Sequence, residues 1–195
     1  MPTTTARPKT GQRRADAVRN VERILEAAIE CLSDRPGATM ADIAKAAGLG
    51  RVTLYGHFAS RAELLEAVLT RIIDQGESLL NDVPLEGNPL DALDALIASS
   101  WRLVDQSKSI ITAAESELSA DRIRDLHDNP AARVEALIKR GRADGSIRTD
   151  MPTSWQVAVL HQILHGAGAE VASGRLDARD APELISNTVH SMFTT

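Results

Sequence analysis

The chain has a single cysteine, Cys31, among its 195 residues. One cysteine excludes an intrachain disulfide and is typical of a protein from a reducing compartment. Because Cys31 falls within an apolar helical pattern, we expect a buried, unreactive thiol rather than a redox sensor. The sequence also lacks an apolar run long enough to cross a membrane, and its polar, basic start does not resemble a signal peptide. We therefore expect a cytoplasmic protein.

Aromatic side chains make up only 3% of the chain, so a hydrophobic core must be built mainly from Leu, Ile, Val and Ala. Alternating apolar and polar residues, the pattern of a half-buried β-strand, are nearly absent. Apolar residues instead recur every three or four positions, between helix-starting residues and terminal glycines. The sequence therefore predicts an all-α fold of about nine helices, at 16–33, 39–47, 51–58, 60–82, 89–104, 110–118, 130–145, 153–173 and 180–192. Capping boxes are predicted at 60–63 and 153–156, and the polar residues 119–129 form either a loop or a short turn of helix.

The chain also lacks an excess of positive charge. Its net charge is −5, which taken alone argues against binding to nucleic acid. Residues 1–61, however, hold ten basic and six acidic side chains, a net charge of +4, so the remainder carries −9. DNA binding by one end of a protein needs such a basic region, because phosphate contacts dominate affinity, although a chance or solubilising pattern would look the same. Residues 1–12 predict a disordered basic arm, which either contacts DNA or is simply solvated.

Residues 39–58 predict two short helices joined by a glycine turn. Thr39 is a good N-cap, and Asp42 three residues later completes an acidic variant of the capping box. An apolar stripe at helical spacing follows, formed by Met40, Ile43, Ala44 and Ala47. Gly48 then suits the left-handed conformation in which many helices end, and a second helix begins at Arg51. This arrangement is a helix-turn-helix, whose second helix enters the major groove of DNA.

The same stretch resembles the signature of the tetracycline-repressor (TetR/AcrR) family of bacterial regulators. The resemblance rests on Ile43-Ala44, Ala47-Gly48-Leu49, Thr53-Leu54-Tyr55, His57-Phe58, Arg61 and Leu64-Leu65. It is dense over about residues 20–70, whereas the rest of the chain agrees only in length and helical layout. The resemblance implies a homodimer in which residues 13–61 bind a palindromic operator, while residues 62–195 dimerise and hold a small-molecule inducer.

The resemblance also implies which side chains contact DNA. It puts Arg51, Val52 and Thr53 at the end of the recognition helix that faces the major groove. The arginine could bond a guanine edge, and the methyl groups of the other two could contact thymine. The candidate phosphate contacts are Thr39, Tyr55, His57 and Arg61, with Lys45 as a further contact on the first helix of the motif.

Two glycines depart from the family pattern. Gly50 stands where the family commonly has a Ser or Thr cap, so the cap is weaker by roughly a few tenths of a kcal/mol and one phosphate-binding hydroxyl is missing. Gly56 lies inside the recognition helix, where it costs about 1 kcal/mol relative to Ala. We therefore expect this helix to order fully only on DNA.

His161 and His165 are four residues apart on one predicted helix and so share a face. That spacing can bind zinc, but no third ligand is evident, so a packed or interface face is preferred and no metal is predicted. The predicted dimer surface comprises His165, Gly166, Gly168 and Val189, and a glycine kink beside a ligand is the alternative. The candidate ligand-binding residues are Trp101, His127, Met151, Trp155 and His161, each of a type that is more often part of a core.

Three classes of function can be compared. We expect a transcriptional repressor that binds double-stranded operator DNA as a homodimer and is released by a small molecule. The alternative on the same fold is an activator or an uninducible DNA-binding protein. An enzyme is not predicted, because the sequence shows no nucleophile–base constellation, phosphate-binding loop or paired catalytic carboxylates. We predict no cofactor, and the sequence names neither the operator nor the inducer.

Overall fold

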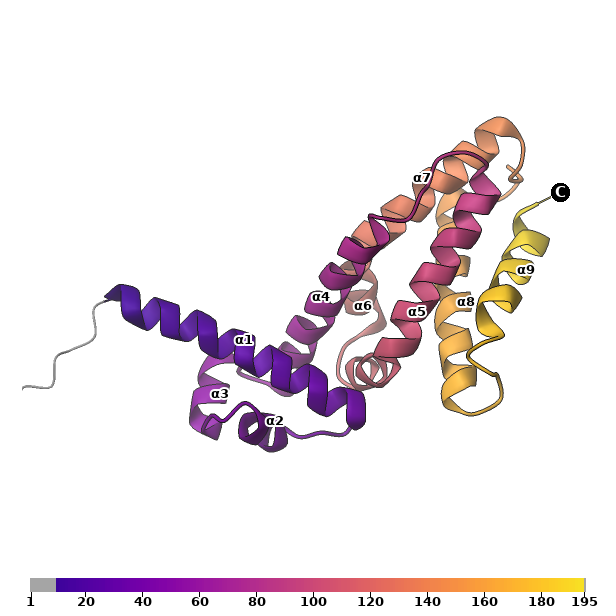
Figure 1. Cartoon of the computed structure of the whole chain (residues 1–195). Helices are drawn as coiled ribbons and strands as arrows, with labels where there is room; N and C mark the ends of the chain where they lie inside the picture. Colours follow the sequence, from indigo (N-terminus) through magenta and orange to yellow (C-terminus); the bar gives the residue numbers. More distant parts are fainter. Residues whose placement is uncertain (1–9, 195) are drawn as a thin grey trace, which may run out of the picture.

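The computed structural model describes residues 10–194, which form nine α-helices and no strand (Figure 1). The helices are α1 Thr10–Asp34, α2 Met40–Ala46, α3 Arg51–His57, α4 Arg61–Leu80, α5 Pro89–Glu115, α6 Ala120–Leu126, α7 Asp128–Asp144, α8 Thr153–Ala172 and α9 Ala181–Phe193. The predicted all-α fold is confirmed. Within this range, no helix has the length and apolar character needed to cross a membrane.

The start of α1 differs from the prediction. The helix begins at Thr10 rather than near residue 16, so the last part of the predicted arm is helical. The remainder of that arm, residues 1–9, lies outside the described residues. The helical residues before the apolar pattern include Gly11 but no proline, and they carry no apolar spacing from which a helix could be predicted.

The helices predicted at 89–104 and 110–118 are one continuous helix, α5. The polar residues between them include no Gly or Pro, and Lys108 pairs with Asp105 one turn away at 3.1 Å. A polar stretch therefore continues the helix instead of ending it. In the next segment, which the sequence left open, the Ser119 hydroxyl accepts the backbone N–H of Arg122 and starts α6.

Local capping explains how the helix-turn-helix starts and stops. The Thr39 hydroxyl accepts the backbone N–H of Asp42 at 3.2 Å, and the Asp42 carboxylate accepts the N–H of Thr39 at 2.9 Å, which confirms the capping box. Gly48 has the expected positive φ, 63°. At the start of α4 the Ser60 hydroxyl accepts the N–H of Glu63 at 3.1 Å.

The capping box predicted at 153–156 is wrong. α8 has no side-chain cap, and Gln156 is completely buried instead of turning back to the helix start. Its Oε1 accepts a hydrogen bond from Arg142 at 3.1 Å, and its Nε2 approaches the carbonyl oxygen of Arg148 at 3.4 Å. A buried amide needs such partners, and here they tie α8 to α7 and to the connection between them.

We call α1–α3 the head and α5–α9 the body, with α4 running from one to the other (Figure 1). The head is built around buried aliphatic side chains, with Ile24, Leu32, Ile43 and Leu54 at 0% exposure. The same buried cluster takes in Leu64, Leu65 and Val68 of α4 and Ile110 and Ala113 of α5. Packing is therefore continuous across residue 61, the predicted domain boundary.

The body has its own core, formed where α5 packs against α7, α8 and α9 (Figure 1). Its fully or almost fully buried members are Leu93, Ile97, Trp101, Ile138, Ile147, Leu160, Ile185, Val189 and Phe193. Gly76 of α4 is also buried, and a Cβ there would lie 3.0 Å from Leu103 Cδ1, so the glycine permits the close approach of α4 and α5. Leu79, near the end of α4, is 62% exposed and lies outside this packing.

Candidate DNA-binding surface and ligand region

The recognition helix α3 has one buried side and one exposed side. Leu54 is its only buried residue, at 0% exposure, and Phe58 is buried in the same cluster just after the helix ends. Arg51, Val52 and Thr53 on the first turn are exposed, with Val52 at 88%. These three side chains contribute little to the core, so the first turn of α3 is open to a partner surface.

Several basic side chains of the head are engaged within the protein. Arg19 pairs with Asp16 on α1, and Arg35 pairs with Asp42 at 2.9 Å. Within residues 10–194, by contrast, no ion pair or side-chain hydrogen bond involves Lys45 of α2 or Arg51 of α3. Uncommitted positive charge therefore lies on both helices of the helix-turn-helix, as an anionic partner requires.

The turn between α2 and α3 is held by a residue whose role the sequence did not indicate. Arg23 of α1 donates from Nη2 to the carbonyl oxygen of Ala47 at 2.6 Å. The same nitrogen would lie 3.0 Å from a Cβ at Gly48, so a side chain there would disturb the contact. Arg23 therefore positions the turn that orients α3. It could not be recognised from sequence because its partner is a backbone carbonyl of another helix.

The predicted phosphate contacts at the edges of the motif differ in availability. Tyr55 is 51% exposed, and His57 is half-buried. The Thr39 side chain is exposed, but its hydroxyl donates to Asp42 Oδ2 at 2.8 Å. The hydrogen bonds from Thr39 also lower the pKa of the Asp42 carboxyl group, which keeps it an acceptor. Thr39 would have to break this hydrogen bond to Asp42 before its hydroxyl could donate to a phosphate.

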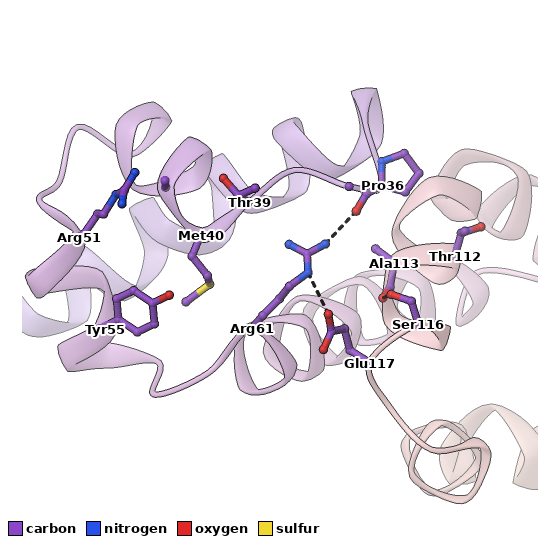
Figure 2. A pocket seen from close by; sticks show the side chains of 12 residues that line it. Pro36, Thr39, Met40, Arg51, Tyr55, Arg61, Thr112, Ala113, Ser116 and Glu117 are labelled. Carbon is purple, nitrogen blue, oxygen red and sulfur yellow. Dashed lines mark hydrogen bonds and ion pairs between the residues drawn. The ribbon is translucent and has the colours of Figure 1, made fainter.

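Arg61 has the most intramolecular partners among the predicted DNA contacts. Its guanidinium donates to the carbonyl oxygens of Ala38 and Pro36, the latter at 2.8 Å, and its Nε lies 3.4 Å from Glu117 Oε1 (Figure 2). Pro36 and Ala38 precede α2, whereas Glu117 follows α5. Arg61 thus links the head to the body, and we call this set of contacts the Arg61 latch.

The Arg61 latch borders an open hollow between head and body, with a volume of about 790 Å³ (Figure 2). Met40, Arg51 and Tyr55 line it from the head, and Thr112 and Ser116 line it from the end of α5. The hollow lies beside the packed contact between head and body, in which Ile110 and Ala113 of α5 join the buried cluster of the head. Arg61 adds polar contacts to both sides at the edge of the hollow.

The predicted ligand-binding residues do not form one site. Trp101 is a core residue, 3% exposed, whose indole N–H donates to the Ala178 carbonyl oxygen at 3.1 Å. Trp155 is 58% exposed on the outside of α8. Of the five predicted residues, the structure brings only His127 and His161 together, with ring centroids 5.0 Å apart.

The predicted dimer residues also point in different directions. Val189 is fully buried in the body core, and a Cβ on the buried Gly168 would lie 3.3 Å from Val104 of α5. His165 packs against His161, with ring centroids 4.3 Å apart. Of these four residues only Gly166 is exposed, so the outer side of α8 consists mainly of other residues. The exposed residues on that side are Trp155, Ala158, Gln162, Gly166 and Ala169.

Known proteins share both the motif and the layout of this chain. The family model described as "Bacterial regulatory proteins, tetR family" matches residues 24–68. The chain is 28% identical to the HTH-type transcriptional repressor LfrR of Mycolicibacterium smegmatis, over 88% of this chain and 89% of LfrR. It is 27% identical to the HTH-type transcriptional repressor KstR2 of the same species, over 67% of this chain and 68% of KstR2.

Solved structures agree in fold. A TetR-family transcriptional regulator from Agrobacterium tumefaciens superposes with a TM-score of 0.70 at 18% identity, covering 92% of this chain and 100% of that one. LfrR from Mycobacterium smegmatis, in complex with proflavine, superposes with a TM-score of 0.65 at 23% identity, covering 91% and 98%. Residues 24–68 match the DNA-binding region of the tetR family, and the similarity to curated repressors extends over most of the chain, so this chain is a DNA-binding transcriptional regulator that resembles the TetR family in sequence and fold.

Proposed function

We propose that the chain is a homodimeric repressor that binds a palindromic operator and leaves it when a small molecule binds the body. The observation that carries this proposal is the first turn of α3, where Arg51, Val52 and Thr53 are exposed on a helix anchored by the buried Leu54. A recognition helix needs this combination of a fixed inner side and an open outer side.

At the level of residues, Arg51 donates to guanine O6 and N7, and the methyl groups of Val52 and Thr53 contact thymine. Lys45, Tyr55 and His57 contact the phosphates on either side, where such contacts fix register but carry little sequence information. Arg61 acts in this proposal as a link between head and body, because its guanidinium already has three partners. Thr39 acts chiefly as the cap of α2.

Dimerisation is proposed to use the outer sides of α8 and α9, which pack side by side (Figure 1). Trp155 on α8 is 58% exposed and Leu184 on α9 is 50% exposed, and small residues follow Trp155 along the same side of α8. An exposed tryptophan beside small residues suits a packed helix interface. Two heads held by such an interface would reach successive major grooves, about 34–36 Å apart.

Oligomeric state tests this surface directly. Trp155→Glu should convert the dimer to a monomer in sedimentation velocity at micromolar concentration, because it places a charge in the interface. Leu79→Glu is the matched control, since Leu79 is an equally exposed apolar residue on α4. A dimer that survives Trp155→Glu, or that is lost equally with Leu79→Glu, would contradict the proposed interface.

Release by a small molecule is supported by the relative LfrR, whose structure was solved in complex with proflavine. In this proposal the effector favours a dimer in which the two recognition helices are wrongly spaced for the operator. The coupling is reciprocal, so operator DNA weakens effector binding by the same factor. The chain would act in the cytoplasm, where the operator is accessible.

The test is selection of fragments from the genome that encodes the chain, repeated after addition of a small-molecule extract of the same cells. Recovery of one short palindrome that is lost with the extract is the expected result. A palindrome that survives every extract would favour an activator or an uninducible regulator on the same fold. Failure to enrich any sequence at moderate salt would contradict sequence-specific DNA binding.

A further inference from the structure

Three histidines meet in the body although they come from two distant segments of the chain. His127 lies at the junction of α6 and α7, and His161 and His165 lie one turn apart on α8. The His127 ring centroid is 5.0 Å from that of His161 and 5.8 Å from that of His165. One ring nitrogen of each residue lies within 4.8 Å of the other two. We propose that these residues, the histidine cluster, bind a divalent transition-metal ion such as Zn²⁺.

The position of His127 prepares it to act as a ligand. Its Nδ1 lies 2.8 Å from the carbonyl oxygen of Ile123. A carbonyl oxygen can only accept, so Nδ1 carries a proton, and in the neutral ring the lone pair is on Nε2. Metal-bound histidines are commonly oriented in this way, by a hydrogen bond from the other ring nitrogen to a backbone carbonyl.

The two histidines of α8 are also in the form that metals bind. Burial lowers the pKa of His161 to about 3, with His165 and His127 adding to the shift. Burial, together with His127, lowers the pKa of His165 to about 4. Burial thus favours the neutral imidazole, which is the form that binds metal ions. Within residues 10–194 neither ring takes part in a hydrogen bond that would occupy its lone pair.

The ligand set indicates the class of metal. Three imidazole nitrogens suit Zn²⁺, Co²⁺, Ni²⁺ or Cu²⁺, whereas Mg²⁺ and Ca²⁺ require oxygen ligands. Two histidines at positions i and i+4 of a helix are a recurrent half of zinc sites, and a third nitrogen leaves one tetrahedral position open. Water or a donor atom of a small molecule would fill that position.

Metal binding would also adjust the cluster. Its ligand nitrogens lie within 4.8 Å of one another, and tetrahedral zinc with Zn–N bonds of about 2.0–2.1 Å holds its nitrogens about 3.3 Å apart. Because His161 and His165 share one helix, the adjustment consists of side-chain rotation together with any movement of the α6–α7 junction toward α8. α6 is in turn joined to α4 by the ion pair of Arg122 with Glu66. A movement of the α6–α7 junction on metal binding would therefore act on α4, the helix that leads to the head.

The test uses the full chain without an affinity tag, freed of metal by a chelator. Titration with Zn²⁺ should show one ion bound per chain, and Co²⁺ should give the visible absorption of a tetrahedral nitrogen site. His127→Gln, His161→Gln and His165→Gln should each weaken binding by at least about 100-fold, since even second-shell changes cost 10–100-fold. The matched control is His190→Gln, which removes a half-buried histidine from α9.

Thermal unfolding separates loss of the site from loss of the fold. Zn²⁺ should raise the Tm of the natural chain and of His190→Gln, because a ligand that binds only the folded state stabilises it. It should leave the Tm of folded cluster variants unchanged. The proposal is overturned if no ion of this class binds the natural chain, or if binding survives all three substitutions. A cobalt–thiolate charge-transfer band would likewise overturn it, because it would assign the metal to Cys31.

These measurements need no DNA, so they stand apart from the proposed repressor function. A second arm, which rests on that function, compares operator affinity with and without Zn²⁺. A change in affinity that disappears in His165→Gln would make the metal a regulator of DNA binding. Tight metal binding with unchanged operator affinity would confirm the site and reject its regulatory role.

Discussion

The head and the body display their polar groups in opposite ways. In the head, the groups offered to DNA come from one continuous stretch, from Thr39 to His57, and most of them are exposed. In the body, the histidine cluster joins the α6–α7 junction to α8 and is shielded enough that burial lowers two of its pKa values. Local sequence thus forms the proposed DNA-binding surface, whereas only the tertiary fold forms the candidate site in the body.

This difference predicts that the two regions can be damaged separately. Short helices with few buried anchors should lose function through single substitutions that leave the body folded. The shared cluster of head, α4 and the end of α5 sets a limit to that independence.

The largest effect is expected from Leu54→Ala. Leu54 is the only buried residue of α3, and truncation of a fully buried leucine costs about 2–5 kcal/mol. The recognition helix should leave the core, and operator binding should be lost. Fluorescence anisotropy with labelled operator measures binding, and urea unfolding measures stability.

Leu93→Ala, the equivalent change in the body core, should cost as much stability but leave operator affinity intact under conditions where the variant stays folded. Equal loss of affinity in both variants would show that head and body are not separable.

The next largest effect is expected on the affinity and base specificity of operator binding, without a change in stability. Arg51→Ala should leave stability unchanged, because Arg51 is exposed, but weaken operator binding by about 1–3 kcal/mol and relax specificity at one base pair. Affinities for the operator and for its single-base variants provide the measurement. Tyr55→Phe is the companion variant, since loss of a phosphate contact should weaken binding to all of these sequences alike. If Arg51→Ala behaved as Tyr55→Phe does, Arg51 would not read a base.

Substitution of Arg61 tests the contact between the two regions. Arg61→Gln should lower stability by about 1–3 kcal/mol, because the carbonyl groups of Pro36 and Ala38 lose a charged donor. Glu117→Gln should cost less than about 1 kcal/mol, because that pair is partly exposed. The salt dependence of operator binding separates a latch from a phosphate contact. An unchanged slope of log operator affinity against log salt concentration in Arg61→Gln supports the latch. A slope whose magnitude is reduced by about 1 would restore the phosphate role.

The smallest expected effect is a gain in stability and in operator affinity. A Cβ at Gly56 would meet nothing within 4 Å, so Gly56→Ala should stabilise α3 by about 0.5–1 kcal/mol and strengthen operator binding. Gly48→Ala is the opposite case, because Gly48 has φ of 63° and Arg23 lies 3.0 Å from the added carbon. The free energy of unfolding and the operator affinity should both rise in Gly56→Ala and both fall in Gly48→Ala. A loss of stability in Gly56→Ala would mean that α3 needs a flexible residue at this position.

Sequence patterns predicted the head well because its determinants are local. The cap at Thr39 and the left-handed Gly48 each follow from a few neighbouring residues, and the structure confirms both. Arg61 was assigned to phosphate by its position in the motif. Its partner Glu117 belongs to a distant helix, so no local pattern could reveal the link.

Prediction was weaker in the body because helical spacing shows which residues share a face, but not what covers that face. The spacing of His161 and His165 correctly predicted a shared face. It could not supply His127, which only the fold brings near. In the same way, apolar periodicity identified Val189 but could not distinguish the inner side of α9 from its outer side, and Val189 is fully buried.

The Arg61 latch bears on how regulators of this kind can be recombined. Its donor lies at the start of α4, two of its acceptors precede α2, and its carboxylate follows α5. A chimera that joins this head together with α4 to α5–α9 of a relative would keep the two carbonyl contacts of Arg61 but inherit whatever residue stands at the position of Glu117. Interchangeable modules would therefore have to carry a compatible acidic residue at that site, and where the new body has none, the positive charge of Arg61 would face it without a counterion.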